Sequence, residues 1–87
     1  MRESEIENYL VERVKALGGE VRKVRWIGRR GAPDRLVMLP GKIVWVELKA
    51  PGAKTKPHQV REHERMRRMG QRVEVVDSVQ AVDEVLR

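Results

Sequence analysis

The sequence predicts a single α/β domain spanning residues 1–87, with the order helix, three strands, helix, strand, helix. Short apolar runs bounded by glycine and proline alternate with segments whose apolar residues recur every three or four positions. The two central runs, 36–39 and 43–46, are separated by a turn at Pro40 and Gly41, which predicts a β-hairpin. A chain of this length has room for one domain only.

The first helix is predicted over residues 2–17, because its apolar residues form one stripe: Ile6, Leu10, Val14 and Leu17. Ser4 and Glu7 have the spacing of a capping box at the start of this helix. Gly18 and Gly19 end it. A strand is predicted over 20–27, followed by a loop rich in glycine and arginine that leads into the hairpin.

The second helix is predicted from Pro57 to Met69, since proline suits a first helical turn and Gly70 stops the helix. Its apolar positions are sparse: Val60, Met66 and Met69. A final strand is predicted over 71–76. A last helix, capped by Ser78, then places its apolar residues inside: Val79, Val82, Val85 and Leu86.

The net charge of +6 is unevenly distributed along the chain. Residues 22–72 hold 15 Lys/Arg and 4 Asp/Glu, a difference of +11, whereas the remainder holds 4 basic and 9 acidic residues, a difference of −5. This asymmetry indicates an anionic partner, of which nucleic acid is the commonest. The alternative is an ordinary solvated surface in a charge-rich protein.

Three charged residues interrupt the apolar hairpin: Asp34 before its first strand, and Glu47 and Lys49 at the end of its second. Glu47 and Lys49 lie two positions apart and therefore share one face of the strand. A hairpin could bring Asp34 close to Glu47, and a divalent cation would relieve their repulsion. Hard oxygen ligands in a chain without cysteine favour Mg²⁺ or Mn²⁺, and Lys49 could stabilise developing negative charge.

These residues carry a resemblance to a known family. Ala32-Pro33-Asp34 followed by Glu47-Leu48-Lys49 resembles the signature of the PD-(D/E)XK nuclease superfamily. The longer set resembles its VRR-NUC family, the virus-type replication-repair nucleases: Gly31 to Asp34, Val46 to Gly52, Gln59, and Gly70 with the valine-rich strand after it.

The resemblance implies a restriction-endonuclease-like αβββαβ core with a mixed central sheet flanked by helices, plus a short C-terminal helix. It also implies DNA cleavage dependent on Mg²⁺ or Mn²⁺. Asp34 and Glu47 match the metal-binding acids, the Leu48 carbonyl is a further ligand, and Lys49 matches the catalytic lysine. An acid of the first helix completes such sites; Glu7 is the first choice and Glu3 the alternative.

Gln59 matches a glutamine of the family at the start of the second helix, although polarity at a helix start would also explain it. Stand-alone relatives in this family resemble Holliday-junction resolvases and tend to be homodimers, so the resemblance implies branched DNA as substrate and a homodimer. The expected location is the cytoplasm of a bacterial or phage-infected cell. We expect no membrane association and no small-molecule cofactor.

Five basic residues near the predicted site are candidates for contact with DNA phosphates: Arg29, Arg30, Arg35, Lys54 and Lys56. Loop arginines and lysines are also often only exposed charge. Two other functions remain open from sequence: a nucleic-acid-binding module without catalysis, and a structural oligomerisation domain. Neither needs a lysine two residues after a strand glutamate.

Overall fold

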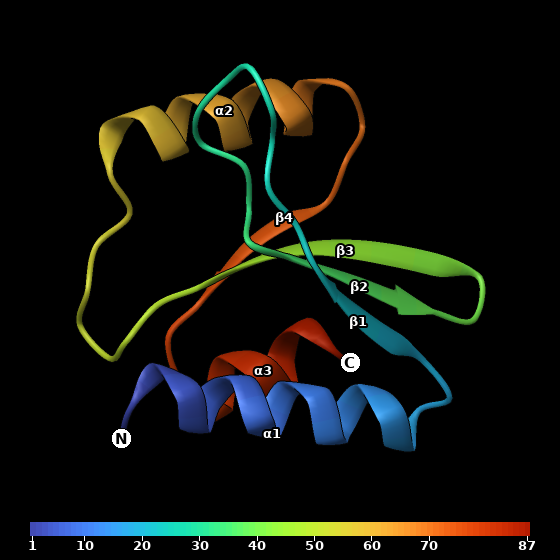
Figure 1. Cartoon of the computed structure of the whole chain (residues 1–87). Coiled ribbons are helices and arrows are strands. Elements are labelled where there is room, and N and C mark those ends of the chain that lie inside the picture. The colour runs from blue at the N-terminus through green and yellow to red at the C-terminus, as the bar shows by residue number, and fades with distance from the viewer.

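A four-stranded sheet separates two layers of the molecule in the computed structural model, which describes all 87 residues. The elements in chain order are α1 (Glu3–Ala16), β1 (Glu20–Lys23), β2 (Arg35–Leu39), β3 (Lys42–Leu48), α2 (Pro57–Arg68), β4 (Val73–Val76) and α3 (Val79–Val85). Helices α1 and α3 lie on one side of the sheet, and α2 lies on the other (Figure 1). The predicted element order and the mixed α/β fold are confirmed.

The strands stand in the order β1-β2-β3-β4. β1 pairs with β2, and β2 with β3, in antiparallel orientation, whereas β3 and β4 run parallel. The parallel pair is possible because α2 carries the chain back across the sheet. Gly41 makes the turn between β2 and β3 with a φ of 82°, a conformation that residues with a side chain rarely adopt.

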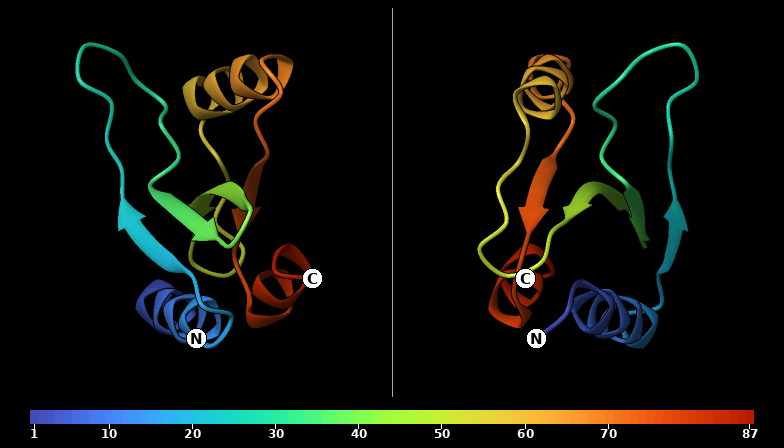
Figure 2. Two further views of the ribbon diagram at one scale, coloured as in Figure 1. Left: turned by 90° about the vertical axis from the view of Figure 1, so that its right-hand side faces the viewer. Right: turned by 60° about the vertical axis from the view of Figure 1, so that its left-hand side comes forward.

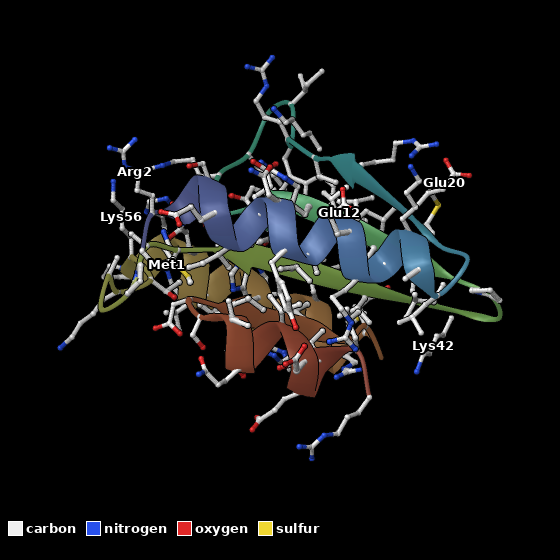
Figure 3. All side chains as sticks on the ribbon, turned by 90° about the horizontal axis from the view of Figure 1, so that it is seen from below. Met1, Arg2, Glu12, Glu20, Lys42 and Lys56 are labelled. Atoms are coloured by element: carbon white, nitrogen blue, oxygen red, sulfur yellow. The ribbon has the colours of Figure 1, made fainter.

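The hydrophobic core lies between the sheet and the α1/α3 layer. Figure 3 shows α1 and α3 side by side across that face. Its buried residues come from both helices and three strands: Ile6, Leu10, Val14, Val37, Val44, Val46, Leu48, Val76, Val82, Val85 and Leu86. Alternate residues of β3 supply Val44, Val46 and Leu48, which leaves Trp45 and Glu47 on the α2 side of the sheet.

Two helix starts test the capping predictions. At α1 the capping-box acid is Glu5, whose Oε1 accepts the Arg2 N–H at 2.9 Å. The prediction of Ser4 with Glu7 was therefore wrong by two residues, because the helix begins at Glu3 and its N-cap is Arg2. At α3, Ser78 Oγ accepts the Ala81 N–H at 3.0 Å, as predicted.

The first strand ends at Lys23, four residues before its predicted end. There the Val24 N–H donates to the Asp34 carbonyl at 3.0 Å, and the chain between these residues leaves the sheet as a loop. This segment, residues 24–34, rises on the α2 side and runs beside that helix (Figure 2). None of the helices is both long enough and apolar enough to cross a membrane.

The second helix buries polar rather than apolar residues against the rest of the protein. Glu62 and His63 are its buried members, whereas Val60 and Met69, two of its predicted apolar positions, are exposed. The helix is held by ion pairs and hydrogen bonds to the 24–34 loop, so apolar periodicity carries little information about its orientation.

Candidate active site

The β2–β3 register brings the two predicted acids together. Arg35 is the partner of Val46 in this antiparallel pair, and continuing the register by one position places Asp34 opposite Glu47. Side chains directly opposite one another share a face, with Cβ atoms roughly 5 Å apart. Asp34 Oδ1 accepts the Leu48 N–H at 3.0 Å, which fixes this carboxylate against the end of β3.

Glu47 is a buried carboxylate, with 4% of its surface exposed. Its Oε2 lies 3.3 Å from Lys49 Nζ and accepts a hydrogen bond from Gln59 Nε2 at 3.2 Å. Its Oε1 is buried and has no hydrogen-bond partner. Burial raises the pKa of Glu47 above the ordinary value of 4.5, and the nearby Asp34 carboxylate raises it further, while Lys49 opposes both effects.

Lys49 and Gln59 form a connected pair beside Glu47. Lys49 Nζ donates to Gln59 Oε1 at 3.1 Å, and the same oxygen accepts the Lys56 N–H at 2.9 Å. An amide can donate to a carboxylate through its NH₂ group and accept from an ammonium through its oxygen at the same time. Gln59 therefore orients Lys49 and Glu47 and also closes the first turn of α2. Two of the three ammonium donors of Lys49 are used here, which leaves one for a ligand.

Glu7 forms a partly buried ion pair and does not lie among the other acids. Its carboxylate pairs with the guanidinium of Arg35, whose Nε donates to Glu7 Oε2 at 2.9 Å. Arg35 Nη1 also donates to the Asp34 carbonyl at 2.9 Å and lies 3.8 Å from Asp34 Oδ2. Arg35 was predicted to bind DNA, but only 12% of its side chain is exposed and its donors serve the protein itself. Glu3 is exposed.

The donor set fits a Mg²⁺ or Mn²⁺ ion held by two carboxylates. Glu47 Oε1 lacks any partner, and Asp34 Oδ2 has only the distant contact with Arg35 at 3.8 Å. Mg²⁺ typically binds through one or two carboxylates and keeps waters or phosphates as its remaining ligands. No group of three or more acidic or histidine side chains is placed to hold a metal, so Asp34 and Glu47 are the two acids that would hold such an ion here, and Glu7 would join them only on leaving its ion pair with Arg35.

The other predicted basic residues lie on two loops. Lys54 and Lys56 are exposed in the segment between β3 and α2. Arg30 is exposed in the 24–34 loop, where its Nη2 lies 3.3 Å from His58 Nδ1. Arg29, in the same loop, lies with its Nη2 3.1 Å from Glu62 Oε1.

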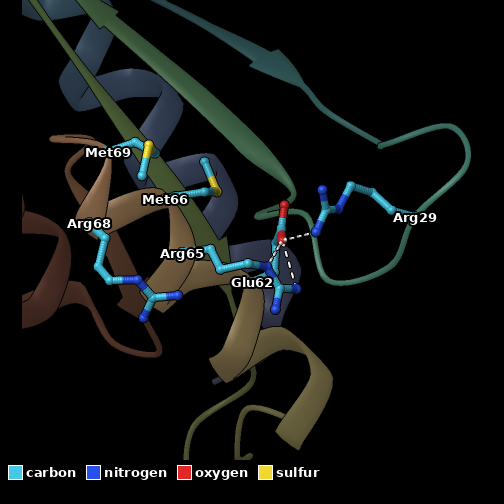
Figure 4. A pocket seen from close by; sticks show the side chains of 6 residues that line it. All are labelled: Arg29, Glu62, Arg65, Met66, Arg68 and Met69. Atoms are coloured by element: carbon cyan, nitrogen blue, oxygen red, sulfur yellow. Dashed lines mark hydrogen bonds and ion pairs between the residues drawn. The ribbon is translucent and has the colours of Figure 1, made fainter.

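Glu62 is a residue whose importance the sequence did not reveal. Its Oε1 contacts Arg29 and accepts from Arg65 Nε at 2.9 Å, while its Oε2 accepts from Trp26 Nε1 at 2.8 Å. Figure 4 shows this carboxylate between the two arginines at a cavity of about 400 Å³, lined by Arg29, Glu62, Arg65, Met66, Arg68 and Met69. Its partners lie up to 36 positions away in sequence, so no local pattern could have indicated the cluster.

His63, next to Glu62, is fully buried with its Nε2 unpartnered. Burial lowers its pKa, and the charge of Arg67 lowers it further. The ring is therefore neutral and packs within the protein. Trp26 and Trp45 meet edge to face with their ring centres 5.6 Å apart.

Comparison with known proteins gives extended similarities in both sequence and structure, although no protein-family model matches the chain. A protein of Acyrthosiphon pisum secondary endosymbiont phage 1 described as "Putative nuclease p44" is 53% identical over 79 residues, which are 90% of this chain and 85% of that protein. A solved structure described as "VRR_NUC domain" is 50% identical with a TM-score of 0.88, covering 97% of this chain and 92% of its own.

Proposed function

The chain belongs to the VRR-NUC family of nucleases, and we propose that it is an endonuclease that hydrolyses DNA phosphodiester bonds with Mg²⁺ or Mn²⁺ held between Asp34 and Glu47. One observation carries this proposal. Glu47 presents a buried, unpartnered oxygen beside a second carboxylate, an arrangement that costs free energy unless a cation is bound.

Each residue of the site has a distinct task in this reaction. Asp34 and Glu47 supply the ionised oxygens, with the Leu48 carbonyl as a further proposed ligand and Glu7 as a proposed completing acid. The cation, when bound, polarises the phosphate and lowers the pKa of attacking water. Lys49 directs its unused N–H toward the phosphate oxygens, where negative charge develops in the transition state, and Gln59 holds Lys49 in that position.

The substrate we propose is branched or otherwise structured DNA, including four-way junctions, bound by a homodimer. A single copy carries one site, and two strands of a junction require two cuts. Arg29, Arg30, Lys54 and Lys56 are exposed on two loops and are the residues that we propose for the phosphate contacts.

The test is a panel of supercoiled, linear, flapped and four-way-junction DNA with Mg²⁺, Mn²⁺ or EDTA, using the wild type and Glu47→Gln. The proposal predicts cleavage by the wild type with either cation and none in EDTA or by the variant. Binding of DNA without cleavage under every condition would instead identify a non-catalytic binding module. Light scattering of the free protein and the junction complex measures the predicted dimer.

A further inference from the structure

Ile27 is held in solvent at the outer end of the 24–34 loop. This residue is 93% exposed, more than any other large apolar residue of the chain. It opens the bend formed by residues 27–30, where the loop turns back toward the site. Single exposed apolar side chains are common on protein surfaces, so the assignment depends on how this one is held and on what surrounds it.

The loop is anchored on both sides of Ile27 by one buried carboxylate. Trp26, the residue before it, donates its Nε1 to Glu62 Oε2 at 2.8 Å. Arg29, two residues after it, lies 3.1 Å from Glu62 Oε1. Further along, Gly31 packs so closely on α2 that an added Cβ would lie 2.6 Å from the His58 carbonyl. The tip is therefore ordered before any partner arrives, which lowers the entropic cost of inserting it.

The surroundings of Ile27 favour a polyanionic partner. Arg25, Arg29 and Arg30 lie within three positions of it, and all three are exposed. An apolar side chain among arginines suits DNA, whose phosphates attract the cations while the stacked bases accept an apolar group between them.

The base of this loop is also part of the candidate active site. Val24 N–H donates to the Asp34 carbonyl at 3.0 Å, and Ile27 follows Val24 by three positions. Three residues span at most about 11 Å, which corresponds to roughly three base steps of about 3.4 Å each. The tip of the loop therefore reaches bases close to the phosphate that the site would cut.

From these contacts, and resting on the proposed nuclease function, we infer that Ile27 is a wedge that inserts between adjacent bases within about three steps of the cleaved bond. Unstacking costs least where pairing is already interrupted. The wedge therefore selects DNA with weakened stacking, such as a branch point, over continuous duplex.

The test uses a four-way junction carrying 2-aminopurine at successive positions from the branch, bound by the full chain in EDTA so that no strand is cut. The wild type should give a several-fold fluorescence rise at one position, because unstacking relieves quenching. Ile27→Ala should lose this rise and cleave the junction in Mg²⁺ about tenfold more slowly, while Ile27→Leu should retain both. Ile43→Ala is the matched control, since Ile43 is also exposed, at 45%, but lies at the hairpin turn.

Two results with Ile27→Ala would overturn the inference. In the first, the variant is indistinguishable from the wild type in fluorescence and cleavage. In the second, light scattering shows that the variant converts a dimer to a monomer, which would assign Ile27 to a second copy. The proposed function fails separately. If the wild type cleaves the junction but gives no fluorescence rise, only the wedge is refuted. If the wild type gives a rise that Ile27→Ala loses, but neither protein cleaves DNA, only the nuclease function is refuted.

Discussion

Replacement of Glu47 by glutamine tests the metal site without relying on catalysis. The amide keeps the shape of the side chain and one oxygen, which can still accept from Lys49 and Gln59. It removes the negative charge that Asp34 repels in the free protein. We therefore expect Glu47→Gln to fold, and to lose the stabilisation that Mg²⁺ or Mn²⁺ gives the wild type.

The size of that stabilisation follows from linkage. A ligand at ten times its dissociation constant stabilises the folded state by about 1.4 kcal/mol. For a domain of 60–100 residues, each kcal/mol raises Tm by roughly 4–8 °C, so the wild type should gain about 6–11 °C. Glu47→Gln should gain less than about 2 °C under the same conditions.

Differential scanning fluorimetry across a Mg²⁺ and Mn²⁺ titration, with EDTA as the baseline, measures both proteins. Glu64→Gln is the matched control, because Glu64 is an exposed glutamate whose partner, Arg67, lies on the same helix. Its metal response should equal that of the wild type. An equal shift in Glu47→Gln and the wild type, or no shift in the wild type, would refute the assignment of Glu47 as a metal ligand.

Four further predictions follow from the contacts around the site. In EDTA, the pKa of Glu47 is raised in the folded protein, so the stabilisation that Glu47 contributes is fully present below about pH 4.5 and is lost as the pH rises through its folded-state pKa. The difference between the Tm of the wild type and the Tm of Glu47→Gln should therefore fall with rising pH. Lys49→Met should lower kcat at least about 100-fold while keeping the Mg²⁺-induced Tm shift. Arg35→Gln should cost about 2 kcal/mol in urea unfolding, less than for a fully buried pair because its glutamate partner is 27% exposed. Lys54→Gln with Lys56→Gln should reduce the slope of log binding constant against log salt by about 2.

Each of these has an outcome that would contradict it, and two of them have a matched control variant. A Tm difference that is constant with pH would contradict the raised pKa, and a Lys49→Met protein with unchanged kcat would contradict its catalytic role. Arg22→Gln breaks an exposed pair with Glu20 and should cost well under about 1 kcal/mol; equal costs for Arg22→Gln and Arg35→Gln would contradict the buried pair. Lys15→Gln with Lys42→Gln removes two exposed charges from other elements and should leave the salt slope unchanged.

Local sequence signals were sufficient for the sheet and the core but not for the long loop. The β2–β3 hairpin was predictable because apolar runs flank a proline-glycine turn, and the stripe of α1 was predictable from its spacing. The early end of β1 was not predictable, because the chain leaves the sheet there. Trp26 then donates a hydrogen bond to Glu62 and Arg29 forms an ion pair with it, and both lie more than thirty positions from Glu62 in sequence. The buried face of α2 was missed for the same reason, since charged groups there replace apolar ones.

The candidate site was predictable to a similar degree. Strand alternation placed Glu47 and Lys49 on one face, and their contact at 3.3 Å agrees with this. The double role of Gln59, which spans the lysine and the glutamate, needed the position of α2 over the sheet. The pairing of Glu7 with Arg35 also needed the packed structure, because it depends on how α1 crosses the start of β2.

The most direct test of the central claim is an anomalous-scattering map from crystals of the protein soaked in Mn²⁺. The account predicts a peak contacted by carboxylate oxygens of both Asp34 and Glu47, and its absence in crystals of Glu47→Gln. A well-ordered site with no peak at these residues, or a peak held by other acids alone, would contradict it.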